Sequence, residues 1–565
     1  MSSHPLVSII PPSSSLPRNH HGPFSSSSKA KSKQKVKSPI EEDDDGDDEC
    51  HNSLKHKPKY FKNPWPSYRS ASLHDAYLAY QLGAAIAPPP PSQPHTCRSS
   101  SSNPVNEYDD QCYSGGEDTA EEEYDSLVSS SRDITGRNGR NKASDVSSII
   151  SKTSKVYIRP DFSSIKDDDE IEDEWRDPPV KVVKPDWIDS QRVENDNEAE
   201  AGGGKEKITW LGHAGVLLEI PWKDRSGYAG IIFDPIFSYR CSPTQYVGPA
   251  RYLDSPCSVS ELPEIHICCI SHDHYDHLDY YTIKDLWKYH QSTIHFLVPL
   301  GLKQWFTSSG IPSSRITELD WWHETLISFP SESYEPYSDH EQRYPPSTGE
   351  SDVRLSSETV NEPSSLRLKI AFTPAQHRSG RGLLDHMTTL WGSWCLGVIE
   401  SEEDKEKISQ RGMKDCVGFK AFFGGDTGYR YATAPEGDDD AVCPAFEEIA
   451  SHYSPFSLSL LPLSTGSSLP FLRTILSLSL DQYTLTSSLH CSPLDSLEIH
   501  KILKSKRSFG IHWGTFCDQD ESRGTRIDFG RSRRKLNISK DWFDPDGNCF
   551  VIGDIGQTLE IPEDN

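Results

Sequence analysis

The stretch SHDHYDHLD (271–279) places three histidines and three aspartates within nine positions. It follows the run EIHICCIS, whose apolar and β-branched content is typical of a buried strand. Four metal-binding side chains thus leave the end of one strand: His272, His274, Asp276 and His277. Imidazoles two residues apart on an extended turn can face one metal ion, and the next aspartate and histidine can face a second. A surface turn rarely has this composition, so we predict a metal centre here.

Four neighbouring ligands cannot complete two coordination shells that keep a position open for water. Three downstream residues also follow apolar strands and can converge on the same edge: His377, Asp426 and His512. Each of them alone fits an ordinary turn, but together with the first four they form a full ligand set. This set favours zinc, although the same side chains would accept iron or manganese.

From residue 205 onward, strand-like apolar runs alternate with helical spacing, which indicates an α/β domain. Most of the preceding chain is too polar to offset the entropy of ordering. We expect a disordered tail at 1–58, a short ordered island at 59–90 that docks on the catalytic domain, a disordered linker at 91–175, and the catalytic domain at 176–565. Three polar insertions in that domain are expected to be surface loops, at 331–364, 401–416 and 432–440.

The net charge, the cysteines and the apolar runs of the sequence disfavour several classes of protein. The net charge of −27 disfavours a nucleic-acid partner, because proteins that bind polyanions usually carry basic faces. The 13 cysteines form no CxxC pair and no regular framework, which favours a reducing, intracellular compartment. We expect no secretory signal, because the apolar stretch near the N-terminus is short and broken by proline. No apolar run reaches roughly 18 residues, so we predict no transmembrane segment.

The HxHxDH stretch and its three distant partners resemble the metallo-β-lactamase superfamily, whose fold is an αββα sandwich with a dinuclear zinc site. Other blocks are similar to the family of N-acylphosphatidylethanolamine-hydrolysing phospholipases D, in a fungal-like form with a long N-terminal region. The resemblance covers 178–520 and 62–67. The blocks that carry it include KNPWPS (62–67), VVKPDW (182–187), TWLGHAG (209–215), FDPIFSYRCSPTQYVGPARY (233–252), ELDWW (318–322), WGSW (391–394), GGDTGY (424–429) and IHWGTF (511–516).

This resemblance implies two Zn²⁺ ions in each chain. The expected ligands are His272, His274 and His377 for one ion, Asp276, His277 and His512 for the other, and Asp426 between them. Asp276 and Asp426 would also orient a metal-bound hydroxide that attacks the phosphorus of N-acylphosphatidylethanolamine. The products would be N-acylethanolamine and phosphatidic acid, in a phospholipase D-type hydrolysis without a covalent enzyme intermediate.

Three further residues are assigned to the substrate. Arg381 closely follows His377 and is expected to pair with the phosphate, with a surface salt bridge as the alternative. Gln376 and His490 are assigned to the substrate as well. The segment STGSSLPFLR (464–473) departs from the pattern of the animal members, so the details of the substrate channel stay open there.

Two other functions remain as alternatives. The first is hydrolysis of another ester or phosphodiester, such as a lactone or a cyclic phosphodiester, by the same fold. The second is a nonenzymatic scaffold, which the loss of metal ligands would mark. A nuclease of this fold is disfavoured by the acidic charge and by the lack of basic stripes.

A phospholipid substrate requires a site that opens at a membrane surface. The best candidate for membrane contact is the Ser- and Leu-rich segment 455–480, with Phe456, Phe471 and Leu472 as the inserted side chains. The competing interpretation places these residues in the core. We therefore expect a cytoplasmic protein with peripheral membrane association. A mitochondrial membrane and a homodimer are both left open.

The two interpretations of this segment predict different behaviour of the variant Phe471→Asp/Leu472→Asp. If the side chains insert into lipid, their apolar area contributes about 25 cal/mol per Å² to binding. The variant should then no longer float with liposomes, and its thermal midpoint should equal that of the unmodified chain. A collapsed midpoint would instead place the segment in the core.

Overall fold

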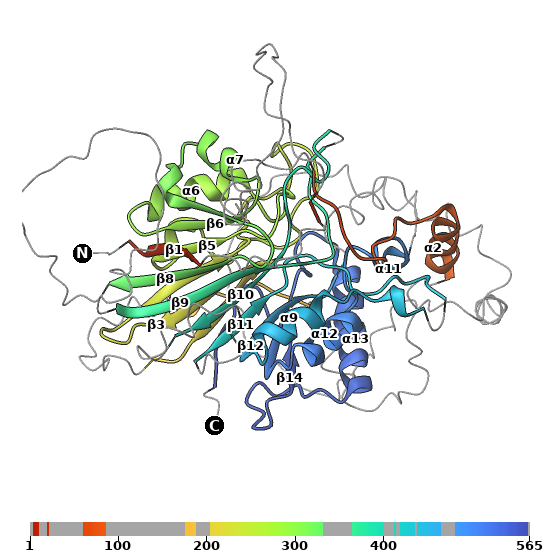
Figure 1. Cartoon of the computed structure of the whole chain (residues 1–565). Coiled ribbons are helices and arrows are strands. Elements are labelled where there is room, and N and C mark those ends of the chain that lie inside the picture. The colour runs from red at the N-terminus through yellow and green to blue at the C-terminus, as the bar shows by residue number, and fades with distance from the viewer. Residues whose placement is uncertain are drawn as a thin grey trace, which may run out of the picture.

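The computed structural model describes residues 4–10, 20–21, 60–85, 176–187, 204–330, 364–382, 384–399, 412–413, 418–435, 438–464 and 481–562. Two sheets lie face to face in these ranges (Figure 1). The seven-stranded sheet has the order β15-β2-β3-β4-β5-β6-β7. Its strands are β2 (Lys207–Gly212), β3 (Gly215–Pro221), β4 (Tyr228–Phe233), β5 (Ile265–Cys269), β6 (His295–Pro299), β7 (Ile316–Leu319) and β15 (Thr558–Glu560).

The second sheet has eight strands in the order β1-β8-β9-β10-β11-β12-β13-β14. These strands are β1 (Leu6–Ile10), β8 (Glu324–Pro330), β9 (Ser364–Thr373), β10 (Ser393–Val398), β11 (Lys420–Phe423), β12 (Leu458–Pro462), β13 (Arg507–Ile511) and β14 (Cys549–Val551). Aromatic side chains join the two sheets. The ring of Phe233 on β4 stacks on that of Phe423 on β11, with centroids 4.8 Å apart.

Helices cover the outer face of each sheet. The helices are α2 (Leu73–Ala85), α6 (Tyr280–His290), α7 (Lys303–Ser308), α9 (Ala445–Tyr453), α11 (Gln482–Thr486), α12 (Pro493–Ile502) and α13 (Gln519–Leu536), with short 3₁₀ turns at Val259–Glu261, Ser313–Arg315 and Asp439–Ala441. Figure 1 shows α6 and α7 on one side of the molecule and α9, α12 and α13 on the other. The αββα sandwich predicted from the sequence is confirmed.

Because both faces of the central strands are covered, these strands are apolar throughout rather than alternating. In β5, Ile267 and Cys269 belong to the large core that joins the sheets, whereas Cys268 packs with Leu286 of α6. The run EIHICCIS is therefore a buried strand, as its sequence predicts, and its carboxyl end carries the metal-binding stretch.

Strand directions bring the distant ligand segments to one edge. β9 and β11 are both antiparallel to β10, so β9 and β11 run the same way, and β11, β12 and β13 are mutually parallel. The carboxyl ends of β9, β11 and β13 therefore meet at the same edge. His377, Asp426 and His512 follow these three ends.

The N-terminal region is not disordered throughout, contrary to the expectation for 1–58. Residues 6–10 form β1, which pairs antiparallel with β8, for example Leu6 with Ser328. His20 and His21 contact Asp320, at distances of 2.8 Å each. The expected linker 91–175 lies outside the described residues.

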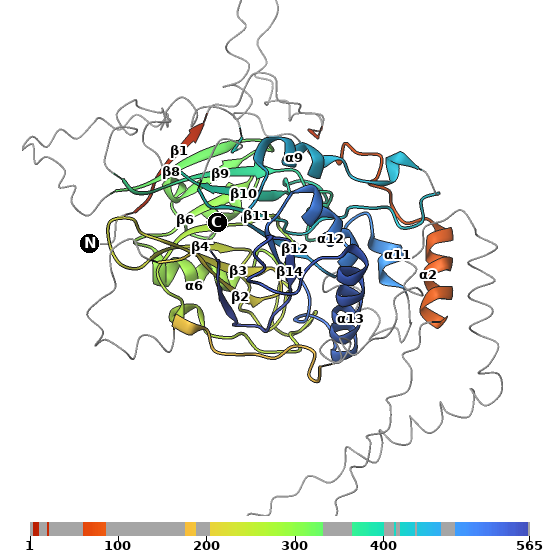
Figure 2. The ribbon, with the colours of Figure 1, turned by 90° about the horizontal axis from the view of Figure 1, so that it is seen from below.

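The segment 60–85 lies along the catalytic domain. Phe61 is fully buried and its backbone N–H donates to the carbonyl of Met387 at 2.7 Å. Arg69 pairs with Asp438 at 3.0 Å. Further along, α2 lies beside α11, and the backbone N–H of Asp481 donates to the carbonyl of Ala79 at 2.9 Å (Figure 2).

Two of the expected surface insertions hold buried residues. In 401–416, Gly412 accepts from Lys369 Nζ at 2.9 Å and donates to Glu324 Oε1 at 2.7 Å. In 432–440, Ala432 and Ala434 are buried. Those parts are anchored in the fold rather than being surface loops. The insertion at 331–364 falls almost wholly outside the described residues, which resume at 364.

The membrane contact expected for Phe456 is wrong. Phe456 is fully buried, and its ring lies 5.6 Å from that of Phe422 on β11, so it is a core residue just before β12. Phe471 and Leu472 lie outside the described residues. Among the described residues, no helix combines the length and the apolar content that crossing a bilayer requires.

The buried ring of Phe61 predicts which side chain holds the segment 60–69 on the domain. Phe61→Ala should destabilise this docking by about 3 kcal/mol, the lower end of the cost of removing a buried phenyl ring. Amide hydrogen exchange should then become faster over 60–69. The matched control is Tyr60→Ala, because the side chain of Tyr60 is exposed. Equal exchange in the two variants would contradict the anchoring role.

Candidate metal centre

The loop after β5 is held in place by Asp234, which follows the neighbouring parallel strand β4. Asp234 Oδ1 accepts the backbone N–H of Ser271 at 2.7 Å, and Oδ2 lies 2.7 Å from His277 Nδ1. A proton on Nδ1 then turns the lone pair of His277 Nε2 toward the centre. Asp234 thus fixes both the loop and the tautomer of one ligand.

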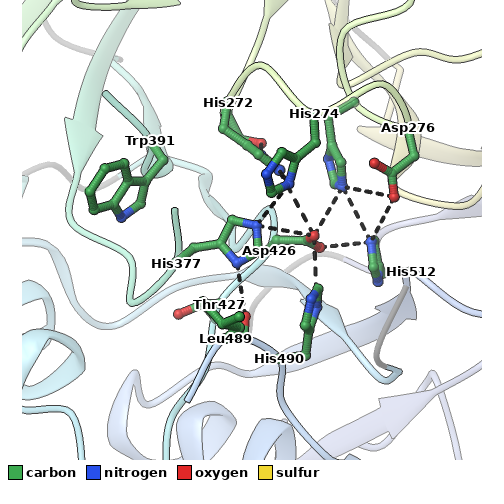
Figure 3. A network of polar contacts seen from close by, with 12 residues as sticks. His272, His274, Asp276, His377, Trp391, Asp426, Thr427, Leu489, His490 and His512 are labelled. Atoms are coloured by element: carbon green, nitrogen blue, oxygen red, sulfur yellow. Dashed lines mark hydrogen bonds and ion pairs between the residues drawn. The ribbon is translucent and has the colours of Figure 1, made fainter. Parts of the chain in front are cut away.

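The seven sequence-predicted metal ligands lie close together (Figure 3), and with His213 they form two groups. The first group comprises His272, His274, His377 and Asp426; the second comprises His213, Asp276, His277 and His512. Asp426 lies between them. Its Oδ1 is 2.7 Å from His512 Nε2, and its Oδ2 is 3.2 Å from His277 Nε2 and 3.6 Å from His377 Nε2.

The arrangement of nitrogen atoms fits a pair of metal ions. His272 Nε2 lies 2.9 Å from His274 Nδ1, and His277 Nε2 lies 3.2 Å from His512 Nε2. Five ligand imidazoles and two carboxylates converge here, and all of them are buried except His274, which is partly exposed. Divalent transition ions between these atoms would account for such close approach, and imidazole with carboxylate is the ligand chemistry that they prefer.

The charge of Asp426 also supports the presence of metal ions at this site. Burial raises the pKa of the Asp426 carboxyl, but His512 and His277 outweigh it and hold that pKa well below its ordinary value. Asp426 is therefore a carboxylate, and a buried carboxylate requires a compensating positive charge.

His213 is a member of the site that the sequence did not single out. It lies in the tight turn between β2 and β3, with φ of 52°, and its Nε2 is 2.9 Å from Asp276 Oδ2. Burial, and next the neighbouring His512, lower the pKa of His213 to about 3, so its imidazole is neutral at pH 7. His213 orients Asp276.

Asp234 was missed too, but the sequence did contain a signal for it. AGIIFDP ends a predicted strand with an acid, and β4 is the parallel neighbour of β5. An acidic side chain at the carboxyl end of the adjacent parallel strand could have been assigned to the same edge. The signal for His213 is weaker, because a single histidine in a tight turn is common.

Gln376 is a structural residue, contrary to its assignment to the substrate. It is fully buried, and both ends of its side-chain amide have protein partners. Its Nε2 donates to the carbonyl of Ser488 at 3.1 Å, and its Oε1 accepts from the hydroxyl of Ser67. Nearby, Asn63 Nδ2 donates to the carbonyl of His377 at 2.6 Å. The NPWPS block thus contacts the segment that carries a metal ligand.

Arg381 binds the backbone of the metal-binding loop. Its guanidinium is therefore not placed to pair with a substrate phosphate, as the sequence had suggested. Its Nε donates to the carbonyl of Asp273 and its Nη2 to the carbonyl of Leu278. The guanidinium also lies over the rings of Tyr275 and Trp305, at 4.5 and 5.4 Å from their centroids. These contacts are neither the phosphate pairing expected nor a surface salt bridge.

Of the three residues assigned to the substrate, His490 is the one that faces the centre. Its Nδ1 lies 3.8 Å from Asp426 Oδ2, and its ring stacks on that of His512 with centroids 5.8 Å apart. Burial lowers the pKa of His490 to about 4, although Asp426 opposes the shift. A neutral imidazole therefore borders the metal centre.

Comparison with known proteins identifies related chains. Residues 230–513 match the family model described as Beta-lactamase superfamily domain. An N-acyl-phosphatidylethanolamine-hydrolyzing phospholipase D 1 of Caenorhabditis elegans is 30% identical over 362 residues, which are 63% of this chain and 76% of that protein. A mitochondrial protein of the same name from Saccharomyces cerevisiae is 26% identical over 330 residues, 58% of this chain and 51% of the yeast protein.

Among solved structures, a metallo hydrolase of the archaeon Ignicoccus hospitalis is similar with a TM-score of 0.34 and 13% identity, over 64% of this chain and 100% of that one.

The contacts of Arg381 predict a loss of metal rather than a loss of substrate affinity when it is replaced. Arg381→Lys cannot reach both loop carbonyls, so the variant should retain less metal after dialysis against a weak chelator, by about 10-fold or more in affinity. The control is Arg378→Lys, since Arg378 is exposed on the same segment. A raised KM with unchanged metal retention would restore the substrate role.

Proposed function

The chain belongs to the family of N-acylphosphatidylethanolamine-hydrolysing phospholipases D within the metallo-β-lactamase superfamily, and we propose that it hydrolyses N-acylphosphatidylethanolamine to N-acylethanolamine and phosphatidic acid. As a member of this superfamily it is a metal-dependent hydrolase. The observation that carries the proposal is Asp426, a buried carboxylate shared between two groups of histidine ligands.

The metal ions proposed here are two Zn²⁺. When bound, they would supply a water molecule of lowered pKa and positive charge for the phosphate oxygens. His272, His274 and His377 would hold one ion, Asp276, His277 and His512 the other, and Asp426 would contact both.

The remaining residues keep these ligands in position and in the correct protonation state. Asp234 holds a proton on His277 Nδ1, and the carbonyl of Leu489, 2.9 Å from His377 Nδ1, does the same for that ligand. His213 orients Asp276 by its 2.9 Å contact. The contacts at Nδ1 leave Nε2 of His277 and of His377 free of protons and available to a metal ion.

We assign the contact with the substrate phosphate to His490. A neutral imidazole can donate a hydrogen bond to a phosphate oxygen, and the 3.8 Å distance between His490 Nδ1 and Asp426 Oδ2 supports this assignment. The substrate is a membrane lipid, so we also propose that the protein works at a membrane surface as a peripheral protein of the cytoplasm. The mitochondrial name of the yeast relative makes a mitochondrial membrane one candidate.

The reaction is tested with purified protein, N-acylphosphatidylethanolamine in detergent micelles, and water labelled with ¹⁸O. Attack at phosphorus places the label in phosphatidic acid and none in N-acylethanolamine. Mass spectrometry of both products measures this. Removal of metal should abolish turnover, and added Zn²⁺ should restore it.

Asp426→Asn is the matched variant, because it keeps the shape of the side chain and removes its charge. It should lower kcat by at least about 100-fold, which is the upper end of the effect of altering a residue that only supports a ligand. Release of free fatty acid in place of N-acylethanolamine would indicate hydrolysis of another ester. No turnover of any lipid by fully metal-loaded protein would contradict the proposal.

A further inference from the structure

A second cluster of histidine and aspartate lies apart from the metal centre. His20 Nε2 is 2.8 Å from Asp320 Oδ1, and His21 Nε2 is 2.8 Å from Asp320 Oδ2. The three side chains are buried, with exposed fractions of 1%, 7% and 6%. Asp320 directly follows β7, whereas the two histidines come from the N-terminal region. None of the three belongs to the ligand set of the metal centre.

We propose that His20, His21 and Asp320 form an additional metal site that binds a divalent transition ion such as Zn²⁺. Two imidazoles and one carboxylate are a common ligand set for zinc, with a fourth position left for water. The three ligand atoms all lie within 4.8 Å of one another. The two ligand groups of the metal centre meet the same distance limit, and they consist of the same side-chain types, histidine and aspartate.

The charge of Asp320 favours an ion over hydrogen bonds alone. The side chain of Asp320 is only 6% exposed, and a carboxylate removed from water has to be compensated by nearby charge or by hydrogen bonds. Its other partner, the backbone N–H of Trp321 at 2.8 Å, carries no net charge. A divalent ion held between the three side chains would compensate a buried carboxylate more fully than hydrogen bonds alone.

The contacts of His20 show which segments a bound ion would hold together. The ring of His20 stacks on that of Trp321 with centroids 4.2 Å apart. Its carbonyl accepts the backbone N–H of Lys62 at 2.8 Å, which joins it to the docked segment 60–69. A bound ion would therefore tie the N-terminal region to the end of β7 and to this segment.

A short chain of contacts connects this cluster to the catalytic centre. Trp321 Nε1 donates to the carbonyl of Trp391 at 2.6 Å, and Trp391 Nε1 donates to the carbonyl of Ala375 at 2.9 Å. Ala375 lies two residues before His377. The proposed ion thus stabilises the segment that carries the metal ligand His377. It does not contact the substrate, and its role is structural.

Metal content tests the proposal without reference to activity. The full chain is loaded with Zn²⁺, desalted, and analysed for metal per chain. The unmodified protein should contain about three ions, from two catalytic positions and the additional one, and His20→Gln/His21→Gln should contain about two. Glutamine can still donate a hydrogen bond to Asp320, so the variant preserves a hydrogen-bonded contact. The control is His74→Gln/His386→Gln, in which two exposed histidines are replaced.

A second variant keeps the test valid if the first variant does not fold. Asp320→Asn keeps the shape of the side chain and removes the anionic ligand, and it should also lose one ion. Conversely, the variant His274→Ala/Asp426→Asn should lose the catalytic ions and keep the additional ion. If Co²⁺ is loaded in place of Zn²⁺, the visible absorption of Co²⁺ reports the ion that remains. The proposal is overturned if the glutamine variant and the unmodified protein hold the same number of ions; the cluster is then a hydrogen-bonded clamp.

Discussion

The structure depends on one constraint, which is that a negative charge is buried at its centre. Asp426 is buried between two groups of histidines, and its carboxylate is tolerated only because positive charge can be held around it. The ligands come from segments more than 200 residues apart in the chain. His377, Asp426 and His512 meet because β9, β11 and β13 run in the same direction and end at one edge of their sheet. The two-sheet sandwich therefore positions seven side chains so that they can bind two ions.

Much of this arrangement could be predicted from the sequence, because the relevant signals are local. A buried strand followed by HxHxDH specifies where a ligand cluster begins. Strand-ending residues such as His377 and Asp426 follow apolar runs that are visible without a structure. His213 could not be found in this way, because its position depends on a left-handed turn and on contact with Asp276, which is 63 positions away.

The roles of Arg381 and Gln376 were mistaken for a related reason. Both are polar residues close to a ligand in the sequence, and proximity to a site suggested contact with substrate. Their partners are backbone carbonyls and a serine hydroxyl on distant segments, which sequence spacing does not reveal. Phe456 shows the opposite case. An aromatic residue in a serine-rich stretch resembles a surface residue, but the strand that follows it lies in the centre of a sheet.

The strand β1 has a consequence for the state of association of the protein. It pairs along β8, which without it would be the last described strand on that side of the sheet. An uncovered strand presents a row of unpaired N–H and C=O groups, which can pair with another chain. β1 is itself an edge, but it is only five residues long, and proteolytic trimming of the first ten residues would expose the seven-residue edge of β8 in its place. Such a shortened form would be prone to edge-to-edge aggregation even with its active site intact.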